Sequence, residues 1–284
     1  MLLQLEGVKK KYKKFELDCS LNVEEGKIIG VIGRNGAGKS TTFMAILDII
    51  RVDEGRIRIF DKDISALTAQ DKEKIGVVLA DSGFSEWLTV KDIAAIMDGL
   101  YEKFDKAAFL QRCEEMSLPL KQKTKEFSSG MKARLKLLLA ISYGAKLLVL
   151  DEPTAGLDVI ARQQVLDLLR EYMDVEGRSI LISSHISSDL EGICDEIYMI
   201  ENGRIILHED TDELLDRYGV LKVTEEQYAA LDKRYLLRVQ KEKHEVRCLT
   251  DQKDFYIKNY PELVIQRSGI DDVITLMISG KEVM

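Results

Sequence analysis

The residues best suited to chemistry form a glycine-rich segment, residues 33–40, which reads GRNGAGKS. It follows a short apolar run at Lys27–Ile32 and precedes a helical pattern over residues 41–50. Glycines let the backbone fold tightly, so that N–H groups point at phosphate oxygens. A helix that begins there offers its positive end to the same anion. The pattern predicts a phosphate-binding loop in which Lys39 neutralises the β- and γ-phosphates and Ser40 ligates Mg²⁺.

A glycine-rich turn without function is the alternative interpretation of this segment. A chance match to the full pattern is expected in on the order of 1% of chains of this length, and the strand-like run and helical pattern around it lower that figure. The loop is therefore interpreted as a site for ATP held with Mg²⁺. The residues expected to contact the nucleotide here are Gly33, Asn35, Gly36, Gly38, Lys39, Ser40 and Thr41.

A second candidate segment is residues 147–153, which reads LLVLDEP. Four apolar residues predict a buried strand, and two acids follow at its carboxyl end, the edge at which open α/β sheets bind ligands. Asp151 is placed to hold the Mg²⁺ shell, and Glu152 is placed to polarise an attacking water. An ordinary acidic turn would explain this segment equally well if it stood alone. Together with the phosphate-binding loop, the two acids indicate nucleotide hydrolysis.

The elements that position these residues follow from the apolar pattern of the first 200 residues. Short apolar runs, such as Lys74–Ala80 and Ser179–Ser183, alternate with longer helical patterns. Apolar side chains in Val159–Met173 recur at helical spacing. The Asn-Gly pair at residues 202–203 lies between two apolar runs and indicates a hairpin turn. Strands that alternate with helices predict a largely parallel sheet covered on both faces.

The character of the chain changes after about Thr211, where elements become shorter and charges more frequent. Residues 1–213 are expected to form the nucleotide-binding domain, and residues 214–284 a small C-terminal α/β domain with short helices. Its expected strands are Val220–Val223, Tyr235–Val239, Glu245–Leu249 and Leu263–Gln266.

Composition limits the class of protein. The net charge of −8 and the pI near 5.2 argue against a nucleic-acid partner. No apolar run approaches the ~20 residues that a membrane-spanning helix needs, and the N-terminus has no signal-peptide pattern. The expectation is a soluble, cytoplasmic protein whose membrane role, if any, depends on another chain. The cysteines form no CxxC pair and are expected to be structural thiols: Cys19, Cys113, Cys194 and Cys248.

A third segment, residues 127–131 with the sequence FSSGM, precedes a helical pattern shortly before the acidic strand. Here the sequence resembles the ABC transporter family, whose signature at this place usually reads LSGGQ. Ser128 and Gly130 match, whereas the other three residues depart. A serine at a helix N-cap with free N–H groups is also an anion site in its own right. The resemblance implies a P-loop ABC ATPase domain with an antiparallel β-subdomain and a helical subdomain at about 85–145.

The same resemblance assigns roles to further residues. In the family, the signature cap binds the γ-phosphate held by the phosphate-binding loop of a second subunit, which implies a dimer with two ATP molecules between the subunits. Residues 155–158, AGLD, resemble the D-loop and bring Asp158 to that interface. His185 follows the run ILISS, 33 residues past Glu152, and resembles the switch histidine at the γ-phosphate. Tyr12 is either the aromatic residue that stacks on adenine or an ordinary strand aromatic.

One family element departs from the pattern. A Gln usually ends the strand near residue 80, where it senses Mg²⁺ and couples to the membrane partner, but Ala80 stands there with Asp81 adjacent. We hypothesise that Asp81 partly substitutes for it. Trp87, the only tryptophan, follows this loop. It either lines the groove for a transporter's coupling helix or packs within the helical subdomain, and packing is the favoured interpretation.

Within the family, the short N-terminal region, the signature and the small C-terminal extension resemble ATP-binding subunits of ABC-2-type exporters of the bacitracin-export and Ytr types. The implied function is an ATPase motor: MgATP closes the dimer, of identical or different subunits, and drives a separate integral membrane permease. The protein would lie on the inner face of the cell membrane. The C-terminal domain is expected to contribute to dimerisation.

Two other functions remain open at this point. A soluble ABC ATPase acting on ribosomes or DNA is disfavoured, because the chain has one cassette and Lys39 and Asp151 are only 112 residues apart, which leaves no room for a long coiled coil. A cassette that regulates a membrane sensor is the other alternative.

Overall fold

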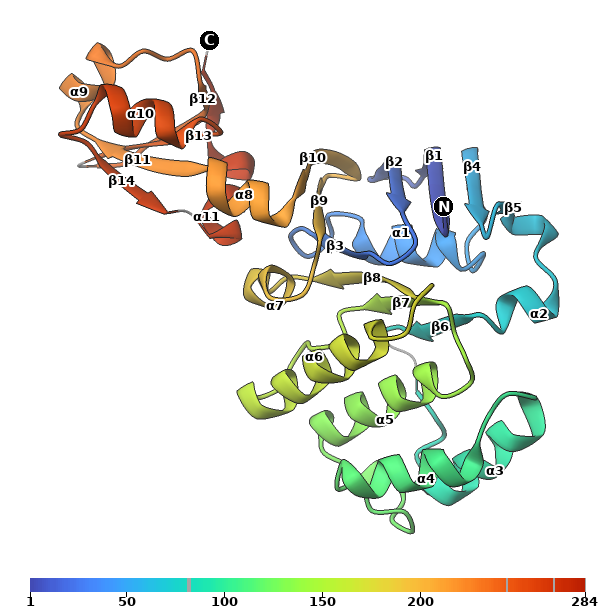
Figure 1. Ribbon diagram of the computed structural model, residues 1–284. Helices are drawn as coiled ribbons and strands as arrows, with labels where there is room; N and C mark the ends of the chain where they lie inside the picture. The colour runs from blue at the N-terminus through green and yellow to red at the C-terminus, as the bar shows by residue number, and fades with distance from the viewer. Residues whose placement is uncertain (81–82, 244, 268, 284) are drawn as a thin grey trace.

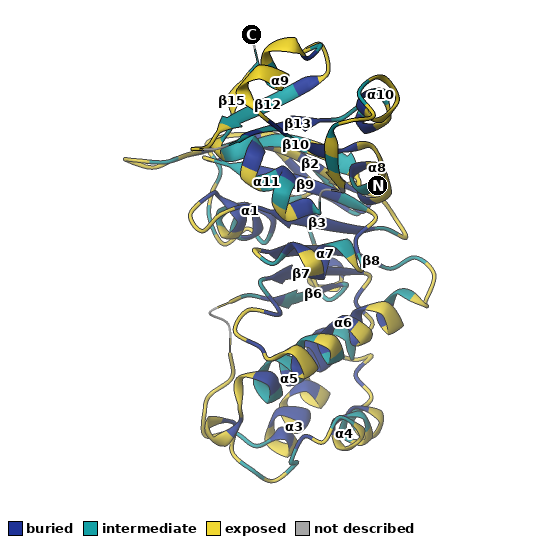
Figure 2. Ribbon diagram, turned by 90° about the vertical axis from the view of Figure 1, so that its left-hand side faces the viewer, coloured by how far each residue is buried: buried dark blue, intermediate teal, exposed yellow. Residues whose placement is uncertain are grey.

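The computed structural model describes nearly the whole chain, over residues 1–80, 83–243, 245–267 and 269–283. Within these residues the strands form two sheets, one of ten strands and one of five (Figure 1). The helices α3 (Val90–Leu100), α4 (Lys106–Glu115) and α5 (Ser129–Ile141) lie beyond the β6 end of the larger sheet. The smaller sheet lies at the opposite end of the molecule (Figures 1 and 2).

The larger sheet joins an antiparallel half to a parallel half. Its strands, in spatial order, are β5 (Lys62–Asp63), β4 (Glu54–Ile59), β1 (Leu3–Lys11), β2 (Glu16–Val23), β10 (Arg204–Asp210), β9 (Glu196–Glu201), β3 (Ile28–Ile32), β8 (Ser179–Ser184), β7 (Leu147–Asp151) and β6 (Ile75–Val78). The strands from β9 to β6 pair in parallel, whereas β1 pairs antiparallel with β2 and β4. The expected parallel sheet is therefore found in one half, and the other half is the antiparallel subdomain that the family resemblance implied.

The parallel strands are covered on both faces, which explains their continuous apolar sequences. In β3, Ile28 and Ile32 pack in the cluster formed with α5 and α6 (Val159–Met173). Ile29 and Val31, which point to the other face, pack in the cluster that contains Phe43 of α1 (Lys39–Ile46). Every residue of β3, β7 and β8 is buried. This core fixes the strand ends at which the candidate site lies.

The predicted hairpin turn at residues 202–203 connects β9 and β10. Asn202 has φ 48° and Gly203 has φ 78°, the left-handed conformations that a two-residue turn of this type requires. The N–H of Gly203 donates to the Ala37 carbonyl at 2.7 Å, and the N–H of Asp18 donates to the Gly203 carbonyl at 2.7 Å. A Cβ at residue 203 would lie 1.9 Å from the Glu16 carbonyl oxygen. The turn therefore supports the glycine-rich loop and joins the two halves of the sheet.

The smaller sheet and four helices make up the C-terminal unit, residues 211–283. Its strands, which all pair antiparallel, are β14 (Val264–Arg267), β11 (Gly219–Val223), β13 (Val246–Thr250), β12 (Leu236–Lys241) and β15 (Lys281–Glu282). Its helices are α8 (Thr211–Arg217), α9 (Glu225–Ala230), α10 (Lys253–Asn259) and α11 (Ile270–Ser279). The four strands expected from the sequence are present, and the expected short helices are α8 to α11, whose positions were not predicted. The expected domain boundary at residue 213 falls inside α8.

The two faces of the smaller sheet pack differently. Leu221 and Cys248 belong to a cluster confined to the C-terminal unit. Val220 and Leu249, on the other face, belong with α11 to the large cluster that also contains Leu190 of α7 (Ser187–Glu191). The C-terminal unit therefore shares part of its core with residues 1–210, which we call the ATP-binding unit after the nucleotide site that the sequence predicts there.

All four cysteines are free and buried. Burial raises the pKa of Cys19, Cys113 and Cys248 to about 12, so these thiols stay protonated and behave as small apolar side chains. No helix formed by the described residues combines the length and apolar character that crossing a bilayer requires.

Candidate active site

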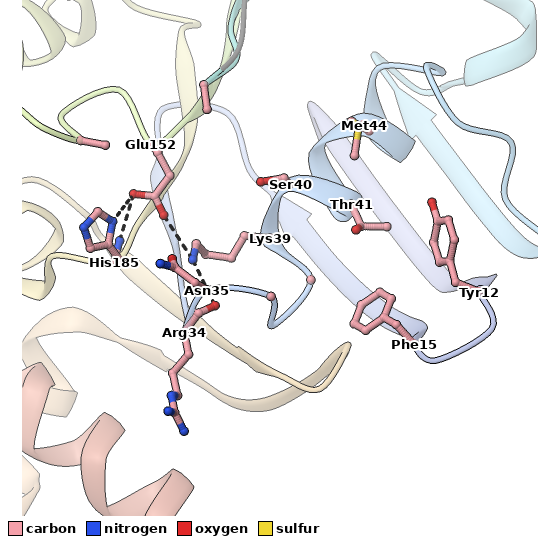
Figure 3. A pocket seen from close by; sticks show the side chains of 14 residues that line it. Tyr12, Phe15, Arg34, Asn35, Lys39, Ser40, Thr41, Met44, Glu152 and His185 are labelled. Atoms are coloured by element: carbon pink, nitrogen blue, oxygen red, sulfur yellow. Dashed lines mark hydrogen bonds and ion pairs between the residues drawn. The ribbon is translucent and has the colours of Figure 1, made fainter. Parts of the chain in front are cut away.

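A cavity of about 660 Å³ lies where the parallel strands end (Figure 3). Residues that follow the carboxyl ends of β3, β6, β7 and β8 contribute to it. It is lined by Tyr12, Phe15, Arg34, Asn35, Gly36, Gly38, Lys39, Ser40, Thr41, Met44, Ala80, Glu152, Ala155 and His185. Most of the residues singled out in the sequence therefore line one cavity. Gly33 and Asp151 do not line it: both are buried, and each directly precedes a lining residue in the sequence.

The glycine-rich loop holds a buried lysine. Gly38 caps α1 with φ 121°, a conformation that only glycine adopts readily. Lys39 is 5% exposed, and its Nζ donates to the Gly33 carbonyl at 2.7 Å and the Arg34 carbonyl at 3.4 Å. The ammonium is thus held across its own loop, beside the N-terminal end of α1, where backbone N–H groups are available to an anion.

Glu152 lies between the lysine and the histidine (Figure 3). Its Oε1 is 3.2 Å from Lys39 Nζ, and its Oε2 is 2.6 Å from His185 Nδ1. The backbone N–H of His185 donates to the same Oε2 at 3.2 Å. An ionised carboxylate only accepts hydrogen bonds, so this contact suits the tautomer of His185 that carries its proton on Nδ1. The three side chains form one connected row at the edge of the sheet.

A residue that sequence reasoning missed, Ser183, supports both acids. Its hydroxyl donates to Asp151 Oδ1 at 2.6 Å and accepts from the Glu152 N–H at 3.0 Å. Asp151 and Ser183 are cross-strand partners in β7 and β8. Their pairing could have been anticipated from the two strand ends, but only once the order of the strands was known.

The donors available to a metal ion are few. Among the described residues, no group of three His, Cys, Asp or Glu side chains could hold a metal ion. Ser40 presents an exposed hydroxyl in the first turn of α1, and Asp151 has its carboxylate at the end of β7. Mg²⁺ is commonly held by one or two protein oxygens together with nucleotide phosphates and waters, so this sparse set of oxygen ligands fits it.

Two aromatic residues form the outer wall of the cavity. Tyr12 and Phe15 come from the turn between β1 and β2, and their ring centroids are 6.2 Å apart. The N–H of Tyr12 donates to the Phe15 carbonyl at 2.8 Å, which closes the turn. Phe15 was missed in the sequence, as was Met44. The signal for Phe15 was its position three residues after Tyr12, across a tight turn.

The signature segment lies outside this cavity. Ser128 caps α5 by accepting from the Met131 N–H at 3.2 Å, and Asp158 caps α6 by accepting from the Ala161 N–H at 2.8 Å. A Cβ at Gly130 would lie 2.8 Å from Ala161 Cβ, so this glycine lets the two helices approach closely. Ser128, Gly130 and Asp158 are not among the residues that line the cavity. The structure of one chain thus separates them from Lys39 and Glu152.

Two further expectations have different outcomes. Ala80 is exposed and lines the cavity, but Asp81 lies outside the described residues. The expectation that Trp87 packs within the helical subdomain is wrong, because its side chain is 64% exposed. The ammonium groups of Lys123 and Lys125 lie 5.1 Å and 4.2 Å from its ring centroid instead.

Comparison with known proteins identifies relatives of this chain. The ABC transporter family model matches residues 17–155. The chain is 34% identical over 201 residues to the ABC transporter ATP-binding protein YtrB of Bacillus subtilis, which covers 71% of this chain and 68% of that protein. It is 30% identical to the Nod factor export ATP-binding protein I of Bradyrhizobium diazoefficiens, covering 99% of this chain and 97% of the relative. A solved ATP-binding subunit of an ABC transporter shares 27% identity at a TM-score of 0.65, covering 75% and 92% of the two chains.

Proposed function

We propose a specific function for this chain from the premise that it belongs to the ABC transporter family, of which it is an ATP-binding subunit and an ATPase. The proposed function is the motor of an exporter that works through a separate membrane permease. One observation carries the catalytic part: Glu152 contacts both Lys39 and His185 at the edge of the phosphate-binding loop.

The proposed reaction is in-line attack of water on the γ-phosphate. Lys39 would transfer its hydrogen bonds from the loop carbonyls and Glu152 to the β- and γ-phosphates. Glu152 Oε1, released from the ammonium, would then orient the water and accept its proton. His185 keeps Nδ1 on Glu152, which leaves Nε2 for the γ-phosphate oxygens. The positive groups and loop N–H donors stabilise the charge that develops on the phosphoryl group.

Ser40 and Asp151 are the proposed protein ligands for Mg²⁺, directly or through water. Held there, Mg²⁺ would supply positive charge that neutralises part of the charge on the nucleotide phosphates. Ser183 keeps one oxygen of Asp151 occupied and thereby orients the other. The role of Asp81 stays a hypothesis, since that residue lies outside the described part of the chain.

A second ABC cassette, identical to this chain or different from it, is the proposed source of the missing contacts. Ser128 at the start of α5, the loop at Gly156 and the first residues of α6 lie side by side on the surface, and the Ser129 hydroxyl donates to the Gly156 carbonyl at 3.5 Å. Val159 and Ile160 on this surface are 77% and 73% exposed. Two neighbouring exposed apolar residues beside a helix N-terminus suit burial against a partner that carries bound phosphate.

A surface on the helical subdomain supports the proposed permease contact. Two hollows of about 210 and 230 Å³ share Gly83, Phe84 and Lys136 in their linings. Tyr101 and Tyr143, whose rings stack at 4.3 Å, line the first of them. The exposed side chain of Trp87 belongs to the same loop region. Apolar hollows rimmed by polar groups are typical of surfaces that receive a helix from a partner.

Export as the direction of transport is supported by similarity alone. The relative that aligns with nearly the whole chain is named for Nod factor export, and similarity to YtrB supports the Ytr-type assignment. The narrower ABC-2 and bacitracin-export assignments rest on the sequence resemblance described above.

Co-purification tests the transporter function. The chain would be tagged, whole cells solubilised in mild detergent, and the bound proteins identified. We expect a polytopic membrane protein in near-equal amount. Ribosomes or nucleic acid in its place would favour the soluble class of ABC ATPase, and a sensor protein would favour the regulatory alternative.

A further inference from the structure

A buried hydrogen bond joins the segments that follow the two proposed catalytic groups. Thr154 comes two residues after Glu152, and α7 begins two residues after His185. Asp189 of α7 is 2% exposed, and its Oδ2 accepts a hydrogen bond from the Thr154 hydroxyl at 2.6 Å. Thr154 is itself completely buried. Side chains 35 residues apart in the sequence therefore meet beneath the active site without lining its cavity.

The segment that Thr154 anchors holds Glu152 in an uncommon backbone conformation. Glu152 has φ 53°, the left-handed region that non-glycine residues rarely adopt. Such conformations persist where surrounding contacts fix them, and they are frequent at active sites. The N–H of Ala155 donates to the Glu152 carbonyl at 3.2 Å, and the N–H of Leu157 donates to the Thr154 carbonyl at 3.2 Å. Thr154 thus lies within the first tight turn, which begins at Glu152, and is the first residue of the second.

The buried carboxylate of Asp189 depends on its hydrogen bond with Thr154, because its charged neighbour, Arg162, is farther away. The guanidinium of Arg162 in α6 lies with Nε 3.7 Å from Asp189 Oδ1, within ion-pair range but beyond a hydrogen bond. A buried carboxylate needs hydrogen-bond donors, and loss of one leaves a costly unsatisfied group. Among the side chains of the described residues, the Thr154 hydroxyl supplies the short hydrogen bond. The positions of Thr154 and Asp189 are therefore coupled through this hydrogen bond.

We propose that Asp189 is a positioning residue for ATP hydrolysis, because its hydrogen bond to Thr154 fixes the position of Glu152 relative to His185. The inference rests on the catalytic roles proposed for those two residues. Because neither Asp189 nor Thr154 lines the cavity, loss of their bond should displace the water-orienting carboxylate and leave ATP binding to the loop intact. Small displacements of a catalytic group cost large factors in rate.

The test compares Thr154→Val, which removes the hydroxyl at constant shape, with Thr154→Ser, which keeps it. We expect kcat for MgATP hydrolysis to fall about tenfold or more in Thr154→Val, whereas KM and the dissociation constant of a fluorescent ATP analogue stay within about twofold of wild type. Thr154→Ser should restore most of kcat. Thr250→Val is the matched control, because Thr250 is also fully buried and its hydroxyl donates at 2.6 Å to the Tyr235 carbonyl in the C-terminal unit. It should lower Tm and leave kcat unchanged.

The inference would be overturned if Thr154→Val, at a temperature where this variant is folded, had the kcat of wild type. It would also be overturned if Thr154→Ser lost as much kcat as Thr154→Val. If Thr154→Val does not fold, Asp189→Asn decides: its neutral oxygen is a weaker acceptor, so kcat should fall severalfold at unchanged KM, and wild-type kcat would overturn the inference. Glu152→Gln, assayed in parallel, distinguishes failure of the positioning role from failure of the catalytic assignment of Glu152. An inactive Glu152→Gln beside a fully active Thr154→Val rejects only the positioning role, whereas an active Glu152→Gln rejects the catalytic assignment beneath it.

Discussion

The two sheets of this molecule differ in where their strands end. In the ATP-binding unit, the carboxyl ends of β3, β7 and β8 lie at one edge, and each is followed by a polar residue of the candidate site: the loop with Lys39, Glu152 and His185. In the C-terminal unit, every strand pairs antiparallel, so neighbouring strands end at opposite edges. A parallel sheet concentrates chemistry at one edge, whereas the antiparallel sheet distributes its polar residues and builds a core.

The units meet at α7, the helix that follows His185. The Ile270 N–H at the start of α11 donates to Glu191 Oε1 at 2.6 Å, and α11 packs in the same apolar cluster as Leu190. Glu191 therefore caps a helix that has no side-chain cap of its own. If one unit is catalytic and the other supports it, substitutions should affect turnover less the farther they lie from β7 and β8. Helix α7 is then the element through which the C-terminal unit could influence catalysis.

The largest effect is expected at Glu152. We expect Glu152→Gln to lower kcat by about a hundredfold or more, because general-base catalysis contributes factors of that order, while ATP binding through Lys39 and Ser40 persists. Phosphate release and binding of a fluorescent ATP analogue measure the two properties. Wild-type turnover in this variant would falsify the catalytic assignment and remove the basis of the comparison.

An intermediate effect is expected at the aromatic wall. Stacking of a base on an aromatic ring contributes about 1–3 kcal/mol, so loss of the ring that contacts adenine should weaken ATP binding about tenfold with kcat at saturating ATP unchanged. Tyr12→Ala and Phe15→Ala decide between the two rings. Tyr235→Ala, at a partly exposed tyrosine of the C-terminal unit, is the control. Unchanged ATP affinity in both Tyr12→Ala and Phe15→Ala would show that neither ring holds the base.

The smallest effect is expected at Glu191. Removing a helix cap costs about 1 kcal/mol, so Glu191→Ala should lower the free energy of unfolding by about that amount and change kcat by no more than about threefold. Denaturant unfolding and phosphate release are the measurements. The control is Glu225→Ala, which breaks an exposed ion pair with Lys241 and should change neither property. A loss of turnover in Glu191→Ala as large as that in Glu152→Gln would make the C-terminal unit part of the catalytic machinery.

The sequence predicts those features of the site that depend on local patterns. Gly36, Gly38 and Lys39 could be placed because a tight loop before a helix requires glycines and a phosphate requires a cation. Glu152 could be placed at the edge of the sheet because charged acids are not expected inside a buried apolar strand and therefore mark its end. The antiparallel half of the sheet followed from the family resemblance, whereas strand alternation alone suggested a more extensive parallel sheet.

Features that depend on strand order or on distant contacts could not be predicted. The support of Asp151 by Ser183 requires β7 and β8 to be neighbours. The bond between Thr154 and Asp189 joins a loop to helix α7, and the spacing of the two residues in the sequence carries no signal. Trp87 was expected to pack within the helical subdomain. Two lysine ammonium groups cover its ring instead, a contact that propensity does not describe.

The central claim is that a second cassette completes the hydrolytic site, which for this chain alone in solution means a second copy. The most direct test measures the mass of the Glu152→Gln variant in solution by light scattering, with and without MgATP, since slow hydrolysis should preserve the closed state. The account predicts a species of 32.3 kDa without nucleotide and one of about twice that mass with it. The double substitution Val159→Glu and Ile160→Glu should bind ATP and keep the smaller mass. A single 32.3 kDa species of Glu152→Gln with ATP bound would contradict the account.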